Sequence, residues 1–130
     1  MIFFGHKFID GENLFHVLDI ESINNTPPAS IIYTEFSEDN LDIIKYCISN
    51  DIRVAVQVNT TTQIVYASAL GASFIVVKKD LAKTAQNLAD TYLFDAKILA
   101  TILNDKDIEE LALLGIDGVL YSQGVIKINS

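Results

Sequence analysis

Apolar and polar residues alternate over the first twenty positions, as they do in strands with one buried face. The two apolar arms read MIFFGHKFI and LFHVLDI, and Asp10-Gly11 between them favours a tight hairpin turn. The pattern therefore predicts an N-terminal β-hairpin over residues 1–21. An irregular connector is expected over 22–30, where Asn, Thr and two prolines gather.

From residue 31 onward, short apolar runs alternate with segments whose apolar residues recur at helical spacing. The predicted strands are IIYTEF (31–36), RVAVQV (53–58), FIVV (74–77), AKILATIL (96–103) and GVLYS (118–122). Strands that are apolar almost throughout and alternate with helices predict a parallel sheet. We therefore expect one α/β domain over 1–130, with about five parallel βα units over 31–122 and a tail over 123–130.

The ends of the predicted helices carry recognisable capping residues. The expected caps are Ser37, Thr60 or Thr61, Asp80 and Asn104 at helix starts, and Gly71 and Gly115 at helix ends. Gly71 and Gly115 each stand between an apolar helix face and an apolar strand. The repetition of this pattern is therefore architectural.

Five parallel strands cannot close an eight-stranded barrel by themselves. Two arrangements remain open at this stage, an open three-layer sheet and a partial barrel-like arc. In the arc, the N-terminal hairpin or a second subunit would cover the exposed edge. Because an uncovered edge strand invites pairing with another chain, we expect a homodimer or other homo-oligomer.

Residues 96–122, AKILATILNDKDIEELALLGIDGVLYS, resemble the last βα unit of (βα)-barrel proteins, most closely glycerophosphodiester phosphodiesterases. The shared features are the strand, an Asn-Asp helix start, an acidic helix and a closing LG(V/I)DG(I/V). The catalytic motifs of that family are absent here. His6 is followed by Lys7 instead of Arg, the chain around Glu35 reads TEFSED, and no second motif histidine follows. The resemblance thus implies a barrel-like fold more than an activity.

Charge and composition narrow the possible partners and location. The chain has 17 acidic and 9 basic residues, a net charge of −8 that repels nucleic-acid phosphates and anionic membrane surfaces. Its apolar runs fall short of the roughly 18 residues of a membrane span, and its N-terminus lacks the basic start of a signal peptide. A single cysteine, Cys47, offers no disulfide framework and is expected in the core. We therefore expect a cytoplasmic protein with no nucleic-acid or membrane partner.

In parallel α/β folds, functional residues gather where strands end. Glu35 and Lys78 follow apolar strands and are the candidate catalytic residues. Glu35 would serve as a general base or metal ligand, and Lys78 as an imine-forming amine. Their structural alternatives are a solvated strand-end acid and a lysine in an exposed turn.

The segment QVNTTTQ leaves a strand and enters a helix, so free N–H groups and hydroxyls there favour a small anionic ligand. The candidate ligand-binding residues are Asn59, Thr60, Thr61, Thr62 and, at the last strand end, Gln123. Ordinary threonine capping is the alternative interpretation. No glycine-rich phosphate motif is present in the sequence.

His6 and His16 lie on the two arms of the predicted hairpin. They would face each other if three residues form the turn, and lie on opposite faces if two or four do. A metal would need a third ligand, and no carboxylate or cysteine stands at a suitable spacing. We therefore predict no metal site and no cofactor.

The sequence favours a binding or interaction module without catalytic machinery. The alternative is a small enzyme, phosphodiesterase-like or aldolase-like, that acts on a phosphorylated or carbonyl metabolite at the C-terminal face of the sheet. What separates the two is whether the candidate residues converge on one pocket. The residues in question are Glu35, Asn59, Thr60, Lys78 and Gln123.

Overall fold

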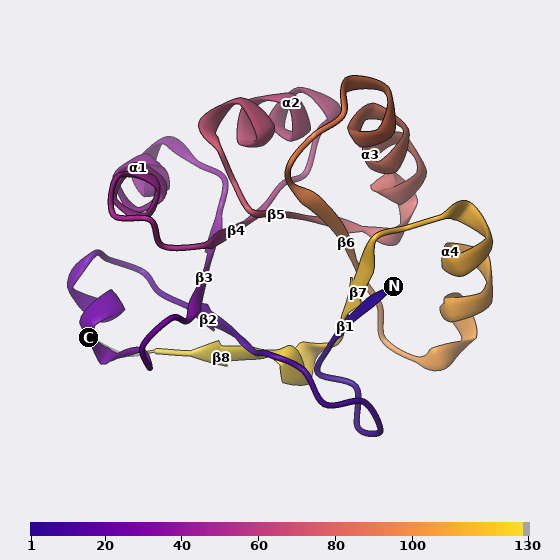
Figure 1. Cartoon of the computed structure of the whole chain (residues 1–130), viewed down its shortest axis with the longest axis horizontal. Coiled ribbons are helices and arrows are strands. Elements are labelled where there is room, and N and C mark those ends of the chain that lie inside the picture. The colour runs from indigo at the N-terminus through magenta and orange to yellow at the C-terminus, as the bar shows by residue number, and fades with distance from the viewer. Residues whose placement is uncertain (129–130) are drawn as a thin grey trace.

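The computed structural model describes residues 1–128, and these form an α/β domain whose eight strands make one curled sheet (Figure 1). The strands are β1 (Ile2–Phe4), β2 (Leu14–His16), β3 (Ile31–Glu35), β4 (Val54–Gln57), β5 (Phe74–Lys78), β6 (Lys97–Thr101), β7 (Gly118–Leu120) and β8 (Val125–Lys127). Their order is β1-β7-β6-β5-β4-β3-β2-β8, and all neighbouring pairs run parallel.

Four helices lie on the outer side of the curl (Figure 1). They are α1 (Leu41–Ser49), α2 (Thr61–Leu70), α3 (Lys79–Tyr92) and α4 (Ile108–Leu114). Short 3₁₀ helices are η1 (Glu21–Asn25), η2 (Glu38–Asn40), η3 (Asp105–Asp107) and η4 (Ser122–Gly124). Because these α-helices all cover one face, the sheet is the barrel-like arc and not the open three-layer arrangement. Within the described residues, no helix has both the length and the apolar character needed to cross a membrane.

The five strands predicted after residue 30 are confirmed as β3 to β7. Gly71 and Gly115 end their helices in the left-handed conformation, with φ of 98° and 79°, and the Thr60 side chain caps α2. The predicted cap at Asp80 is wrong. β5 runs directly into α3, so Lys78 occupies the N-cap position and Asp80 lies in the first helical turn.

The predicted N-terminal hairpin is not formed. β1 pairs with β7, and β2 lies between β3 and β8. Asp10-Gly11 sits in a longer loop, and a Cβ on Gly11 would come within 2.6 Å of the Phe3 carbonyl oxygen. That loop returns the chain so that β2 runs parallel to β3. The hairpin edge that suggested self-association is therefore absent.

The count of about five units is also too low, because three further strands complete the sheet. Two of them, β1 and β2, come from the segment predicted as a hairpin. The third, β8, lies in the predicted tail over 123–130, and the predicted connector over 22–30 contains most of η1. Each extra strand is three residues long, and its place in the sheet is set by partners distant in the sequence, which no local pattern marks.

Side chains on the two faces of the curled sheet form two separate apolar layers. The inner layer fills the centre of the curl and contains Phe4, Leu14, Ile31, Ala55, Val76, Leu99 and Leu120. The outer layer packs between the strands and the helices, and it includes Cys47, which is fully buried as expected. Because side chains fill the interior, a ligand site along the barrel axis can lie only at one of its ends.

The edge strands β1 and β8 approach each other where Gly5 meets Gly124. Gly5 has φ of +83°, and a Cβ there would lie 2.3 Å from the Gly124 backbone nitrogen. A Cβ on Gly124 would lie 2.8 Å from the Phe4 carbonyl carbon. Only glycine allows two backbones to come this close. We call this contact the glycine seam.

A buried amide ties α3 to the sheet. Gln86 is only 3% exposed, and its Oε1 accepts a hydrogen bond from the Asp117 backbone N–H at 3.0 Å. The Asp117 side chain in turn accepts from the Ile98 N–H at 2.9 Å. The aspartate of the GIDG sequence thus joins helix α3 to β6 and β7, which is a structural role.

Candidate functional site

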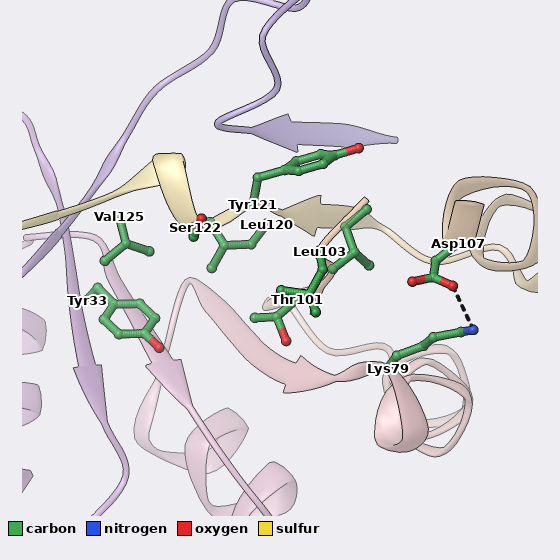
Figure 2. A pocket seen from close by; sticks show the side chains of 10 residues that line it. Tyr33, Lys79, Thr101, Leu103, Asp107, Leu120, Tyr121, Ser122 and Val125 are labelled. Atoms are coloured by element: carbon green, nitrogen blue, oxygen red, sulfur yellow. Dashed lines mark hydrogen bonds and ion pairs between the residues drawn. The ribbon is translucent and has the colours of Figure 1, made fainter. Parts of the chain in front are cut away.

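A cavity of about 320 Å³ opens at the carboxyl ends of β6 and β7 (Figure 2). We call it the mouth cavity. Leu120, Val125 and the ring of Tyr33 form its apolar wall, and Thr101 and Ser122 add hydroxyl groups. Figure 2 shows Tyr33 and Val125 facing Leu120 and Thr101 across the open space. This is the end of the barrel at which parallel α/β folds bind ligands.

An ion pair stands at the rim of the mouth cavity. The Lys79 ammonium lies 2.9 Å from Asp107 (Figure 2). It also lies 2.8 Å from Glu110 in α4. Hydrogen bonds to Glu110 and then Asp107 raise the pKa of Lys79 to about 12. A lysine held in this charged state lacks the free electron pair that a nucleophilic amine needs.

A second cavity, of about 380 Å³, lies beside the first, and we call it the side cavity. Its lining comes from the segment after β1, from the loop between β6 and α4, and from the residues after β7. The residues that line it are Gly5, His6, Lys7, Leu103, Asn104, Asp105, Tyr121 and Gln123. Leu103 and Tyr121 also line the mouth cavity, so the two cavities are neighbours.

Asp105 is held in place by two neighbouring side chains. The Tyr121 hydroxyl donates to Asp105 Oδ1 at 2.6 Å, and His6 Nε2 lies 3.4 Å from the same oxygen. His6 Nδ1 accepts from the Phe8 N–H at 3.1 Å, which leaves the proton of a neutral imidazole on the nitrogen facing Asp105. The imidazole therefore points a donor at the carboxylate.

The same contacts set the proton affinities in this cluster. Burial and the hydrogen bond to Asp105 raise the pKa of Tyr121 to about 12. The hydrogen bond from the Tyr121 hydroxyl is the main cause of the lowered pKa of Asp105. The neighbouring His6 and Lys7 lower this pKa further. Asp105 is therefore a carboxylate at neutral pH, fixed in orientation and open to solvent.

A further group of titratable residues lies on the inner face of the barrel, where β3, β2 and β8 end. Tyr33, His16 and Lys127 are register partners on these three strands, and the His16 and Tyr33 rings meet edge-on at 5.1 Å. Burial lowers the pKa of His16. Burial and the nearby Glu35 raise the pKa of Tyr33 to about 12.

The two candidate catalytic residues lie outside both cavities. Glu35 ends β3 and Lys78 ends β5, and both are exposed. Glu35 acts on Tyr33 and His16 through its charge, and Lys78, the register partner of Thr101 on β6, precedes the first turn of α3. A catalytic role for either residue stays a prediction.

The candidate anion site has the contacts of an ordinary helix cap. The Gln63 N–H donates to Thr60 Oγ1 at 3.2 Å, and the Asn59 N–H donates to Gln63 Oε1 at 2.8 Å. Two of the amides needed for an anion are therefore already satisfied. Thr61 and Thr62 are exposed in the first turn. An enzyme would be favoured if Glu35, Asn59, Thr60, Lys78 and Gln123 converged on one pocket. Of these five residues, only Gln123 lines one of the two cavities, the side cavity.

His6 and His16 belong to different clusters. His6 packs against Tyr121 at 5.2 Å between ring centroids, and His16 packs against Tyr33. Over residues 1–128, no three His, Cys, Asp or Glu side chains come together in a group that could hold a metal ion.

Sequence reasoning missed Tyr33, Asp105 and Tyr121. A usable signal existed for Tyr33: it lies between Ile31 and Glu35 at alternate positions of one strand, so it shares their inward face. Asp105 and Tyr121 are brought together from separate segments, and no local pattern marks their contact.

No protein-family profile matches the chain, and a search of curated proteins finds no significant match. The resemblance of residues 96–122 to phosphodiesterase units therefore stays a prediction.

Proposed function

We propose that the protein is a binding module that holds a small, partly apolar molecule at the carboxyl end of its barrel. The observation that carries this proposal is the mouth cavity, with its apolar wall and its two hydroxyl-bearing side chains. Its volume of about 320 Å³ is at the lower end of the range for small-molecule sites. Apolar surface gives such a site affinity, and the hydroxyls of Thr101 and Ser122 orient the ligand.

Binding is favoured over catalysis by the chemistry of the lining. Lys79 is neutralised by two carboxylates, so it is poorly suited to attack a carbonyl group. The Tyr33 hydroxyl keeps its proton at neutral pH, because its pKa is about 12. These groups can donate hydrogen bonds or fill space, which is what a binding site requires.

The alternative, an enzyme acting on a phosphorylated or carbonyl metabolite, is supported by one observation. His16, Tyr33, Glu35 and Lys127 act on one another at the same end of the barrel. A histidine whose pKa is lowered is largely neutral near pH 7 and can take up a proton. Turnover lost in His16→Gln but retained in Ser122→Ala would favour this alternative.

A cytoplasmic location and self-association are companion proposals. The free thiol of Cys47 is buried, and burial raises its pKa to about 11, so it suits a reducing compartment but does not require one. Leu93 and Leu113 are each 84% exposed, which leaves apolar side chains available for a second copy. Sedimentation velocity over a hundredfold range of protein concentration tests the second proposal, and a constant monomer mass would refute it.

The binding proposal is tested by filling the cavity. We expect Val125→Phe to block binding of benzyl alcohol and cyclohexanol, followed by chemical-shift changes in ¹H–¹⁵N spectra of the full chain. Val65→Phe is the matched control, since Val65 is exposed on α2 and lies outside the cavity. Shifts at Thr101 and Ser122 that vanish in Val125→Phe alone would support the proposal. Shifts that persist in Val125→Phe, or that occur elsewhere, would overturn it.

A further inference from the structure

The mouth cavity and the side cavity meet at one unusually exposed leucine. Leu103 follows β6, is 92% exposed, and lines both cavities together with Tyr121. A leucine so placed gains apolar contacts only if something covers it. A single molecule that crosses Leu103 can therefore occupy both cavities.

The side cavity offers both signs of charge to such a molecule. Asp105 presents a fixed carboxylate, and its Oδ2 accepts no hydrogen bond from residues 1–128. Lys7 brings an ammonium group that forms no ion pair within that same part of the chain, resting instead 4.9 Å from the centre of the Phe8 ring.

Two amide groups stand beside these charges. Asn104 uses its side-chain oxygen to accept from the Lys106 N–H, and Gln123 uses its own to accept from the Ser122 hydroxyl. Neither side-chain NH₂ group donates a hydrogen bond to the described residues. The cavity thus combines one negatively charged oxygen that is free to accept a hydrogen bond with three groups that are free to donate one.

Resting on the proposed binding function, we infer that the ligand is a zwitterion of the α-amino-acid class with an apolar side chain. Its ammonium group pairs with Asp105, and its carboxylate accepts from Lys7 and the amides of Asn104 and Gln123. Its side chain passes over Leu103 into the mouth cavity. Lys7 would repel a ligand that carries only a positive charge, and Asp105 would repel one that carries only a negative charge. A zwitterion places an opposite charge against each of them.

Three probes that share one aromatic tail test this inference. They are L-phenylalanine, phenethylamine, which lacks the carboxylate, and 3-phenylpropanoate, which lacks the ammonium group. Dissociation constants come from ¹H–¹⁵N titrations of the full chain. We expect L-phenylalanine to bind about tenfold more tightly than either single-charge probe, because each lost charge-assisted hydrogen bond weakens binding by about that factor.

Isosteric variants then assign the two charges. Asp105→Asn keeps an acceptor for Tyr121 and should bring the affinity for L-phenylalanine down to that of 3-phenylpropanoate, whose own affinity does not fall. Lys7→Gln should lower the affinity for L-phenylalanine part of the way to that of phenethylamine, because Asn104 and Gln123 still donate to the carboxylate, and it should not lower the affinity for phenethylamine itself. Asp42→Asn on α1, across the barrel from α4 (Figure 1), is the matched control and should change nothing.

The outcomes separate this inference from the proposed function. Equal binding of all three probes, abolished in Val125→Phe, would refute the zwitterion and retain the binding module. No binding of any probe or of the neutral alcohols would refute both. Preferential binding of L-phenylalanine that is lost in Asp105→Asn and in Val125→Phe would support both.

Discussion

Alanine at Gly5 should destabilise the protein far more than alanine at a glycine with the same backbone conformation. Gly5 and Gly115 have φ of +83° and +79°, so alanine suffers similar left-handed strain at either position, about 1–2 kcal/mol. A Cβ on Gly115 meets nothing within 4 Å, whereas one on Gly5 would lie 2.3 Å from the Gly124 nitrogen. The obstacle at Gly5 is backbone, so relief requires the glycine seam to open.

Overpacking of this kind costs about 1–3 kcal/mol in addition to the strain. We therefore expect Gly5→Ala to lower the free energy of unfolding by about 2–5 kcal/mol, and Gly115→Ala by about 1–2 kcal/mol. Gly124→Ala isolates the steric part, because Gly124 does not have a positive φ and its Cβ would meet the Phe4 carbonyl group. Urea unfolding followed by far-UV circular dichroism measures all three. Equal losses at Gly5 and Gly115 would refute a tight seam.

Two further predictions concern single hydroxyl groups. Thr34 is fully buried and its hydroxyl has no hydrogen-bond partner among the described residues, so Thr34→Val should raise the free energy of unfolding by about 1 kcal/mol in urea titrations; a decrease would mean that the hydroxyl is bonded after all. Tyr121→Phe should remove the main cause of the lowered pKa of Asp105. A carboxyl group whose pKa is lower in the folded than in the unfolded state stabilises the fold at pH values above its unfolded pKa of about 4. This contribution to stability is lost as the pH falls through the folded-state pKa. Wild type should therefore lose more stability than Tyr121→Phe between about pH 4 and pH 2, and parallel urea midpoints over that range would contradict this.

The parts of the fold that followed from the sequence are those with a local cause. Strands β3 to β7 are apolar runs bounded by capping residues, and Gly71 and Gly115 end helices for a reason that needs no tertiary context. The prediction of an N-terminal hairpin is wrong because it is based on the local turn signal of Asp10-Gly11. The positions of β1 and β2 are instead set by strands that are distant in the sequence. Ile2 pairs with Gly118, and Leu14 pairs with Val125.

The candidate site was harder to predict than the fold. The end of the barrel at which it lies followed from the alternation of strands and helices. The residues did not, because the strand-end rule selected Glu35 and Lys78, which line neither cavity. Tyr33, Leu120 and Val125 line the mouth cavity only because the sheet curls, and this curl brings together segments from the two ends of the chain.

The position of β1 has a consequence for the order in which the protein folds during synthesis. β1 is synthesised before its sheet partner β7, which begins only at Gly118. At ordinary elongation rates the first strand waits roughly ten seconds for that partner. During this interval Phe3 and Phe4 have no strand to pair with, and a growing chain in this state is open to chaperones or to aggregation.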